Sequence, residues 1–157
     1  MITVRPAQLP DDKPVLLAFI DGLQRFEAEF ESDRRLDATY PEEQFAALRK
    51  QTANGVFLIA EADGKPVGWA AVYEHEAQTY VIAEERRCAV ICEAYVDEAA
   101  RGKGAGRALL SACEAWATGR GLTVVHIGHL AENHRASAVY DKAGYAPYVV
   151  LRRKKLT

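Results

Sequence analysis

The sequence lacks a long apolar run and a surplus of one charge, and each absence excludes a class of protein. No stretch approaches the roughly 20 apolar residues that a membrane-spanning helix needs. The formal net charge of -2 provides no overall field that would draw the chain to nucleic acid or to an anionic membrane. We therefore expect neither partner, and any anion that binds must be held by a local group of residues.

Cysteine is also scarce, and the three that occur do not form the framework of a small disulfide-bonded protein. The first residues, Met1 to Pro6, lack the apolar stretch of a signal peptide. We therefore expect reduced thiols and a cytoplasmic location. Cys88 and Cys92 lie close enough to share a metal ion, but no further ligand is near them in the sequence. Buried apolar thiols fit better than a zinc site, so no metal is expected.

Internal repeats, low-complexity tracts and linkers rich in proline, glycine or serine are absent as well. A chain of 157 residues that is 49% hydrophobic and 27% charged has enough apolar side chains to bury one core. We expect a single domain over residues 1–157.

Local patterns predict a mixture of strands and helices. Apolar spacing and cap residues predict helices over Asp11–Phe26, Pro41–Lys50, Gly104–Thr118 and Asn133–Lys142. Strand-forming residues predict strands over Ile2–Pro6, Val56–Ala60, Pro66–Tyr73, Ala89–Val96, Thr123–His129 and Tyr148–Arg153. One half of the predicted elements is built around a β-hairpin, and the other half has the order β-α-β-α. This order predicts an α/β fold with a mixed sheet and helices on its faces.

A glycine-rich stretch between a predicted strand and a predicted helix is the clearest functional feature. Residues Arg101 to Arg107 have the sequence Arg-Gly-Lys-Gly-Ala-Gly-Arg. Glycine lets the backbone approach a ligand closely, and the first N–H groups of a helix have no partner within the helix. The helix dipole and three cationic side chains add positive charge, which predicts a phosphate-binding cradle. A glycine-rich connection with solvated cations is the alternative for this segment alone.

Two common phosphate-binding motifs do not fit the stretch. A P-loop needs a serine or threonine after its lysine, whereas Gly104 follows Lys103. A dinucleotide fingerprint needs a third glycine where this chain has Arg107 or Leu109.

The residues on either side make the pattern more specific. Val96, Arg101, Gly104 and Gly106 follow the spacing Val-x-x-x-x-Arg-x-x-Gly-x-Gly, after a strand and into a helix. This pattern resembles the acyl-CoA-binding signature of the GNAT superfamily of N-acyltransferases. One departure is Glu98, where many members have proline.

A second motif lies downstream in the expected order. The pattern Asn133-x-x-Ala136-x-x-x-Tyr140-x-x-x-Gly144-Tyr145 resembles the second signature of the same superfamily. The resemblance implies a GNAT-type fold, with a central twisted mixed sheet flanked by about four helices. It also implies an acetyltransferase that passes the acetyl group of acetyl-CoA to a primary amine by direct attack in a ternary complex.

The resemblance also implies which residues contact the cofactor. Backbone groups of Tyr95 and Val96 would pair with the pantetheine arm, on a strand that carries a bulge and splays from its neighbour. Asn133 would contact the pantetheine or its carbonyl groups. The pyrophosphate would be held by Arg101, Gly102, Lys103, Gly104, Ala105, Gly106 and Arg107.

Three residues are candidates for proton transfer. Tyr140 matches the family's acid position, and its alternative role is an aromatic side chain packed between helix and sheet. Glu93 is the first candidate base, because a carboxylate in a nearly apolar strand is costly to bury without a purpose. Its alternative role is a structural ion pair or a carboxylate that faces the sheet edge. His129 competes with Glu93 as the base, although lone histidines on strands are more often structural.

Two charged stretches are candidates for contact with the acceptor or with another partner. The acidic stretch Glu27–Asp33 could attract a cationic amine, or it could be a solvated helix end beside Arg34 and Arg35. The basic stretch Arg152–Lys155 is best explained as a solvated strand end. A small-molecule or peptidyl amine is the expected partner, with a homodimer possible. A CoA-binding sensor without turnover and an unrelated phosphate-binding protein are the alternatives to an enzyme.

Overall fold

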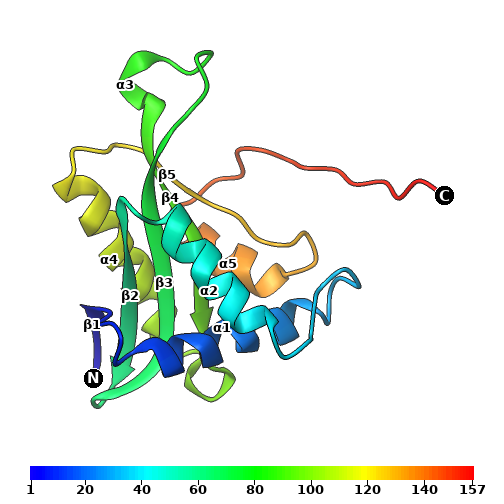
Figure 1. Cartoon of the computed structure of the whole chain (residues 1–157). Coiled ribbons are helices and arrows are strands. Elements are labelled where there is room, and N and C mark those ends of the chain that lie inside the picture. The colour runs from blue at the N-terminus through cyan, green and yellow to red at the C-terminus, as the bar shows by residue number, and fades with distance from the viewer.

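A five-stranded sheet runs through the protein in the order β1-β2-β3-β4-β5 (Figure 1). The computed structural model describes residues 1–157. Neighbouring strands are antiparallel except β4 and β5, which are parallel. The strands are β1 (Ile2–Pro6), β2 (Gly55–Ala62), β3 (Lys65–Glu76), β4 (Arg87–Val96) and β5 (Val125–Ile127). This mixed sheet with helices around it confirms the predicted fold class.

Helices cover both faces of the sheet. The four longer ones are α1 (Lys13–Glu27), α2 (Tyr40–Gln51), α4 (Ala105–Gly119) and α5 (His134–Lys142). The sequence did not indicate the single-turn helix α3 (Ala83–Arg86) or the 3-10 turn η1 (Glu98–Ala100). No helix has the length and apolar composition that crossing a membrane requires.

Two apolar clusters join these layers, one on each face. Successive residues of a strand point to opposite sides, so Phe57 and Ile59 pack with α1 and α2 while Leu58 and Ala60 pack with α4. Trp69 is fully buried on the α1 side. Each large apolar side chain buried in this way contributes about 1.5–3 kcal/mol. The two clusters together fix the sheet between its helices.

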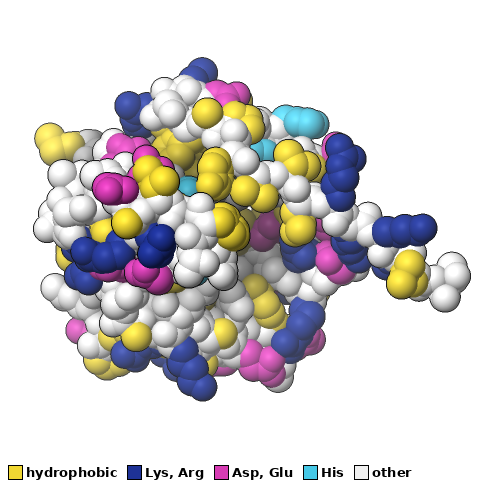
Figure 2. All heavy atoms as spheres, turned by 90° about the horizontal axis from the view of Figure 1, so that it is seen from above, with side chains coloured by type: hydrophobic (Ala, Val, Ile, Leu, Met, Phe, Trp, Pro, Cys, Tyr) yellow, Lys and Arg dark blue, Asp and Glu magenta, His cyan; other side chains and the backbone are white.

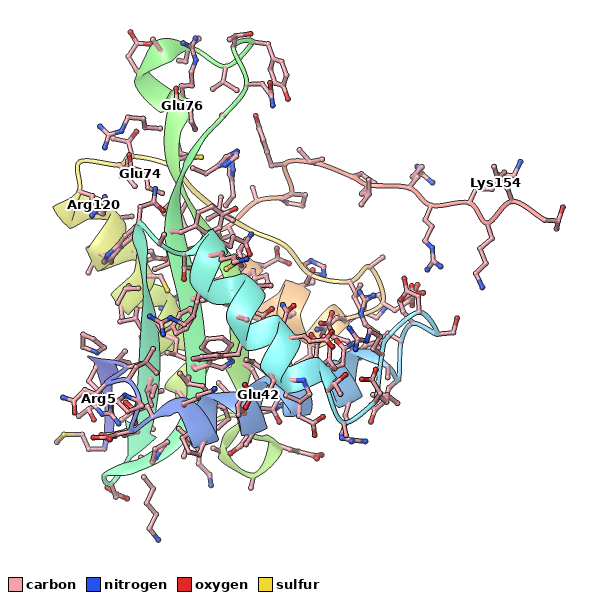
Figure 3. All side chains as sticks on the ribbon, viewed as in Figure 1. Arg5, Glu42, Glu74, Glu76, Arg120 and Lys154 are labelled. Atoms are coloured by element: carbon pink, nitrogen blue, oxygen red, sulfur yellow. The ribbon has the colours of Figure 1, made fainter.

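Arg5, labelled in Figure 3, fastens the start of α1 to the sheet. Its Nη1 donates to Asp12 over 2.7 Å and its Nε donates to Glu61 over 2.8 Å. Asp12 is the N-cap residue of α1, but its carboxylate makes no hydrogen bond to the first turn of that helix. Asp12 thus occupies the N-cap position without bonding to the helix, because Arg5 and the Gln8 amide occupy its carboxylate.

The last two predicted strands differ most from the structure. The strand expected over Thr123–His129 forms only over Val125–Ile127. The strand expected over Tyr148–Arg153 is wrong, since this segment has no secondary structure and leaves the body of the molecule (Figure 1). Its side chains suit a strand, but a strand forms only when a neighbour offers a ladder of backbone hydrogen bonds.

A bulge in β4 determines where the sheet opens. Ala71 of β3 pairs with Glu93 and Val72 pairs with Ile91, so Cys92 is an extra residue in β4. β5 accompanies β4 only from Ala89 to Ile91. Beyond the bulge, β4 therefore has no strand on its β5 side.

A substitution at Gly68 of β3 tests how closely β3 packs against the open end of β4. A Cβ at this position would lie 2.5 Å from the Tyr95 carbonyl oxygen. We predict that Gly68→Ala lowers the free energy of unfolding by about 1–3 kcal/mol, because backbone cannot yield as a flexible side chain does. Chemical denaturation measures this change. The control is Gly119→Ala in the last turn of α4, where a Cβ meets nothing within 4 Å; equal effects of the two substitutions would contradict the crowding.

Candidate active site

A cleft of about 500 Å³ lies where β4 has lost its neighbour. Its walls come from α1, the end of β4, the turn before α4, and α5. The predicted cofactor and acid residues that line it are Tyr95, Val96, Arg101, Gly102, Gly104, Ala105, Gly106, Arg107, Asn133 and Tyr140. Lys103 does not line the cleft, since it is exposed and its ammonium donates to the Ala99 carbonyl over 3.1 Å.

The turn before α4 has the geometry of an anion cradle. Gly102 and Gly104 have φ angles of 76° and 93°, which side chains disfavour. No backbone N–H from Gly102 to Arg107 donates within the chain, and the first that does is Ala108, to Gly104 over 3.0 Å. Six unpaired donors at the positive end of a helix fit a pyrophosphate group. The residues present therefore fit the phosphate part of a CoA molecule.

The two arginines of the cradle hold its walls in place. The Arg101 guanidinium lies over the Phe26 ring, 4.5 Å from its centroid, and its Nε donates to the Val96 carbonyl over 2.9 Å. The Arg107 guanidinium donates to the Lys142 carbonyl at the end of α5 over 3.2 Å. Each contact uses one guanidinium donor, so both arginines keep further N–H groups that can join the backbone donors around an anion.

A second, smaller pocket of about 120 Å³ adjoins the cleft. Glu27, Glu93 and His129 line it, together with Cys92 at the bulge. Tyr140 lines both hollows. Its side chain therefore lies between the cleft and the pocket.

Tyr140 is held as a protonated phenol. Burial, and secondarily the charge of Glu27, raise the pKa of Tyr140 to about 12. Its ring packs beside those of His129 and Tyr145, and its hydroxyl makes no hydrogen bond within the chain. The side chain thus keeps a proton at neutral pH that it is free to donate.

Glu93 has the protonation behaviour of a base at neutral pH. Burial raises the pKa of Glu93 to about 7, and the charge of Glu27 adds to this. The Gln44 side-chain amide donates to Glu93 Oε1 over 3.3 Å and partly offsets the rise. The carboxyl group is therefore divided between its acid and base forms near pH 7.

His129 also lines the pocket and is exposed. Its Nδ1 is 2.8 Å from the Leu130 carbonyl oxygen, which can only accept a hydrogen bond. Nδ1 therefore carries the proton of the neutral ring and Nε2 is left as an acceptor. His126 and His134 line neither hollow.

Asn133 has a structural task besides lining both hollows. As the N-cap of α5, its side-chain oxygen accepts from the Ala136 amide over 3.1 Å. Only its amide nitrogen is left to donate to a bound molecule.

Two residues at the site were not singled out from the sequence: Glu27 lines the pocket, and Gln44 contacts Glu93. Glu27 was included only as part of an acidic stretch, although it follows Leu23 by one helical turn and therefore shares its inward face. Burial raises the pKa of the Glu27 carboxyl, against the opposing charge of Arg34. Gln44 gave no signal, because its contact with Glu93 joins elements far apart in the chain.

Cys92 is a poor nucleophile despite its place in the pocket wall. Burial, and then the neighbouring Glu93 charge, raise the pKa of Cys92 to about 12. The thiol stays protonated at neutral pH, and the thiolate is the reactive form. All three cysteines are unpaired.

Comparison with known proteins identifies the family of this chain. The model of the acetyltransferase (GNAT) family matches residues 20–145. An uncharacterized N-acetyltransferase of Methanocaldococcus jannaschii is 32% identical over 108 residues, 69% of this chain and 46% of that protein. The aminoglycoside N(6')-acetyltransferase type 1 of Stenotrophomonas maltophilia is 32% identical over 111 residues, 69% of this chain and 71% of that protein. The chain thus spans about half the length of the archaeal relative.

Solved structures share the whole fold. A GCN5-related N-acetyltransferase from Ralstonia eutropha matches with a TM-score of 0.74 and 20% identity, over 99% of both chains. A tetramutant protein from Bacillus halodurans matches with a TM-score of 0.81 and 18% identity, over 98% of this chain and 99% of the other. With the motifs, the anion cradle and the family match in agreement, the chain belongs to the GNAT acetyltransferase family.

Proposed function

We propose that the protein is an N-acetyltransferase that moves the acetyl group of acetyl-CoA directly to a primary amine. The observation that carries the proposal is the position of Tyr140 between two hollows. The cleft is lined by five of the six residues with free N–H groups, and the pocket holds Glu93. Bound acetyl-CoA supplies an activated thioester. Its pyrophosphate would rest on Gly102 to Arg107, and its pantetheine arm would lie along Tyr95 and Val96.

Proton transfer is divided between two side chains of the pocket. An alkyl ammonium titrates at about 10.4, so it must lose one proton before its nitrogen can attack and a second as the amide forms. Glu93 accepts the first, directly or through water, once its carboxyl is ionised, and the second replaces the proton that Tyr140 gives up. As the nitrogen–carbon bond forms and the carbon–sulfur bond breaks, Tyr140 donates its proton to the leaving sulfur. The protonated Cys92 thiol beside the pocket supports direct transfer over an acyl-enzyme.

The charges of the pocket indicate the class of acceptor. Glu27 and Glu93 both face a hollow of about 120 Å³, which suits a small cationic group better than a neutral or anionic one. We propose a cationic primary amine as the acceptor. The similarity to an aminoglycoside acetyltransferase supports an acceptor with several amino groups. We also propose a cytoplasmic location, where unpaired thiols persist.

The acid is tested by Tyr140→Phe. We predict that kcat, measured as thiol release from acetyl-CoA with an accepted amine, falls about a hundredfold to ten-thousandfold. The Kd for acetyl-CoA should stay the same, because the hydroxyl acts only on the leaving sulfur. Tyr145→Phe is the matched control, since that hydroxyl donates to Glu114 over 3.0 Å, outside the reaction. Near-normal turnover of Tyr140→Phe would remove the acid role.

The base is tested by a pH profile. A base must be ionised, so kcat/KM of the natural chain should rise with pH and level off above a pKa of about 7. We predict that Glu93→Gln lowers kcat/KM and removes this inflection, whereas His129→Gln keeps it. The reverse result, with the inflection lost only in the histidine variant, would assign the base to His129.

The cradle is tested at Gly106, which lines the cleft. A Cβ there would meet no protein atom nearer than 3.9 Å, so Gly106→Ala should fold normally. We predict that the added methyl group raises the Kd for CoA about tenfold in a calorimetric titration, because it keeps the pyrophosphate off the backbone donors. Gly119→Ala, at the other end of the same helix, is the control. Unchanged CoA affinity in Gly106→Ala would place the phosphates elsewhere.

A further inference from the structure

The Glu93 carboxyl has one hydrogen-bonding partner within the chain. The side-chain amide of Gln44 donates from Nε2 to Glu93 Oε1 over 3.3 Å, and no lysine or arginine pairs with the carboxylate. Glu93 lies on β4 directly after the bulge and lines the smaller pocket, whereas Gln44 belongs to α2 and does not line it. The amide therefore reaches the carboxylate from outside the pocket.

The backbone of α2 at Gln44 has little freedom to move. The next residue, Phe45, is 5% exposed and packs in the apolar cluster that joins α1 and α2 to the sheet. Burial of such a ring contributes about 1.5–3 kcal/mol, which is more than an exposed ion pair provides. Lys13 of α1 adds a second tie, since its Nζ pairs with Glu42 (labelled in Figure 3) over 3.0 Å and lies 5.2 Å from the centre of the Phe45 ring. The fold thus holds Gln44 at a fixed place beside β4.

An amide in this position orients a carboxylate without neutralising it. A carboxylate oxygen can only accept, so the amide donates through its nitrogen and leaves Oε2 of Glu93 for a molecule in the pocket. A hydrogen bond to the charged form is stronger than one to the neutral form. The contact therefore favours the ionised carboxyl and opposes the effect of burial on its pKa. An arginine there would instead form an ion pair and hold the carboxyl ionised far below neutral pH.

We propose that Gln44 is a positioning residue for the base, because its amide holds Oε1 of Glu93 so that Oε2 faces the pocket and takes the first proton of the acceptor ammonium. This role rests on the proposed function, in which Glu93 is the base. Gln44 itself lines neither the cleft nor the pocket. Its contribution is therefore to the geometry and the protonation of Glu93, and not to the binding of either substrate.

Few other charges act on Glu93 at neutral pH. The titratable groups that surround it are, element by element, Glu27 of α1, Tyr40 of α2, Cys92 of β4, His129 after β5 and Tyr140 of α5. Burial raises the pKa values of the two tyrosines and of Cys92 to about 12, so these three stay neutral. Glu27, which has Arg34 3.8 Å away, raises the pKa of Glu93 by its charge. Over the face shown in Figure 2, basic and acidic side chains lie beside one another, so that face carries no patch of one sign that would shift Glu93 from a distance.

The pH profile of kcat/KM tests this role in Gln44→Met, which keeps the length of the side chain and removes the donor. Loss of a bond to the ionised form raises the pKa of Glu93, so the rise of kcat/KM should move up by about one pH unit. Gln44→Lys places a cation there and should move the rise to lower pH, which a merely structural role would not do. Gln51→Met is the matched control, because that amide on the same helix donates to the Tyr73 hydroxyl over 3.3 Å, away from the site. Its profile should equal that of the natural chain.

Carbon-13 NMR titration of the Glu93 carboxyl separates this role from the proposed function, because it needs neither acetyl-CoA nor an amine. The signal is assigned by its absence in Glu93→Gln. We expect its midpoint to rise by about one pH unit in Gln44→Met, to fall in Gln44→Lys and to stay in place in Gln51→Met. Thermal unfolding of each variant checks that it is folded.

The two measurements give distinct outcomes. Shifts of opposite sign in the two Gln44 variants, by both methods, support the proposal. If neither the NMR midpoint nor the kinetic profile moves, while Glu93→Gln still removes the inflection, Gln44 has no positioning role and the proposed base stands. If the NMR midpoint moves and the kinetic profile does not, Glu93 is not the base, and the role of Gln44 is lost with it.

Discussion

The separation of β4 from β5 is the constraint on which the site depends. Up to Ile91 the two strands form a parallel ladder, and the extra residue Cys92 ends that register. Beyond it, backbone groups of β4 face a cleft instead of a strand. The bulge also places Glu93 in the pocket wall, and the end of β4 leads into the turn before α4. One local irregularity thereby opens the cleft along the end of β4 and places the Glu93 carboxylate in the adjoining pocket.

Two opposite electrostatic environments share this opening. The cradle from Gly102 to Arg107 offers backbone donors and a helix dipole, whereas the pocket offers the carboxylates of Glu27 and Glu93. Under the proposed function, an anionic donor and a cationic acceptor would bind in one site without any need for a net charge on the protein. Tyr140 lies where they meet, and burial keeps it protonated. Because each environment is local, both are compatible with the formal net charge of -2.

How far the sequence predicts the structure depends on the range of the interaction. The glycines of the cradle and the helix after it follow from local conformational preferences, and both occur where the pattern places them. The bulge at Cys92 depends on strand register, which no single segment contains. The Gln44 contact to Glu93 joins α2 to β4, so it became visible only in the fold. Tyr148 to Arg153 shows the converse, since suitable side chains formed no strand without a neighbour.

The most direct test of the account is mass spectrometry after the protein, acetyl-CoA and a panel of cationic primary amines are mixed. We predict that an amine gains one acetyl group, that free CoA is released, and that no acetylated protein is found at any time. Transfer by direct attack requires all three results. Acetylated protein is not expected because Cys92, the only thiol in the pocket wall, stays protonated. Tight binding of acetyl-CoA with no amine acetylated would contradict enzymatic transfer and support a CoA-binding sensor. Acetylated protein that passes its acetyl group to the amine would contradict direct attack.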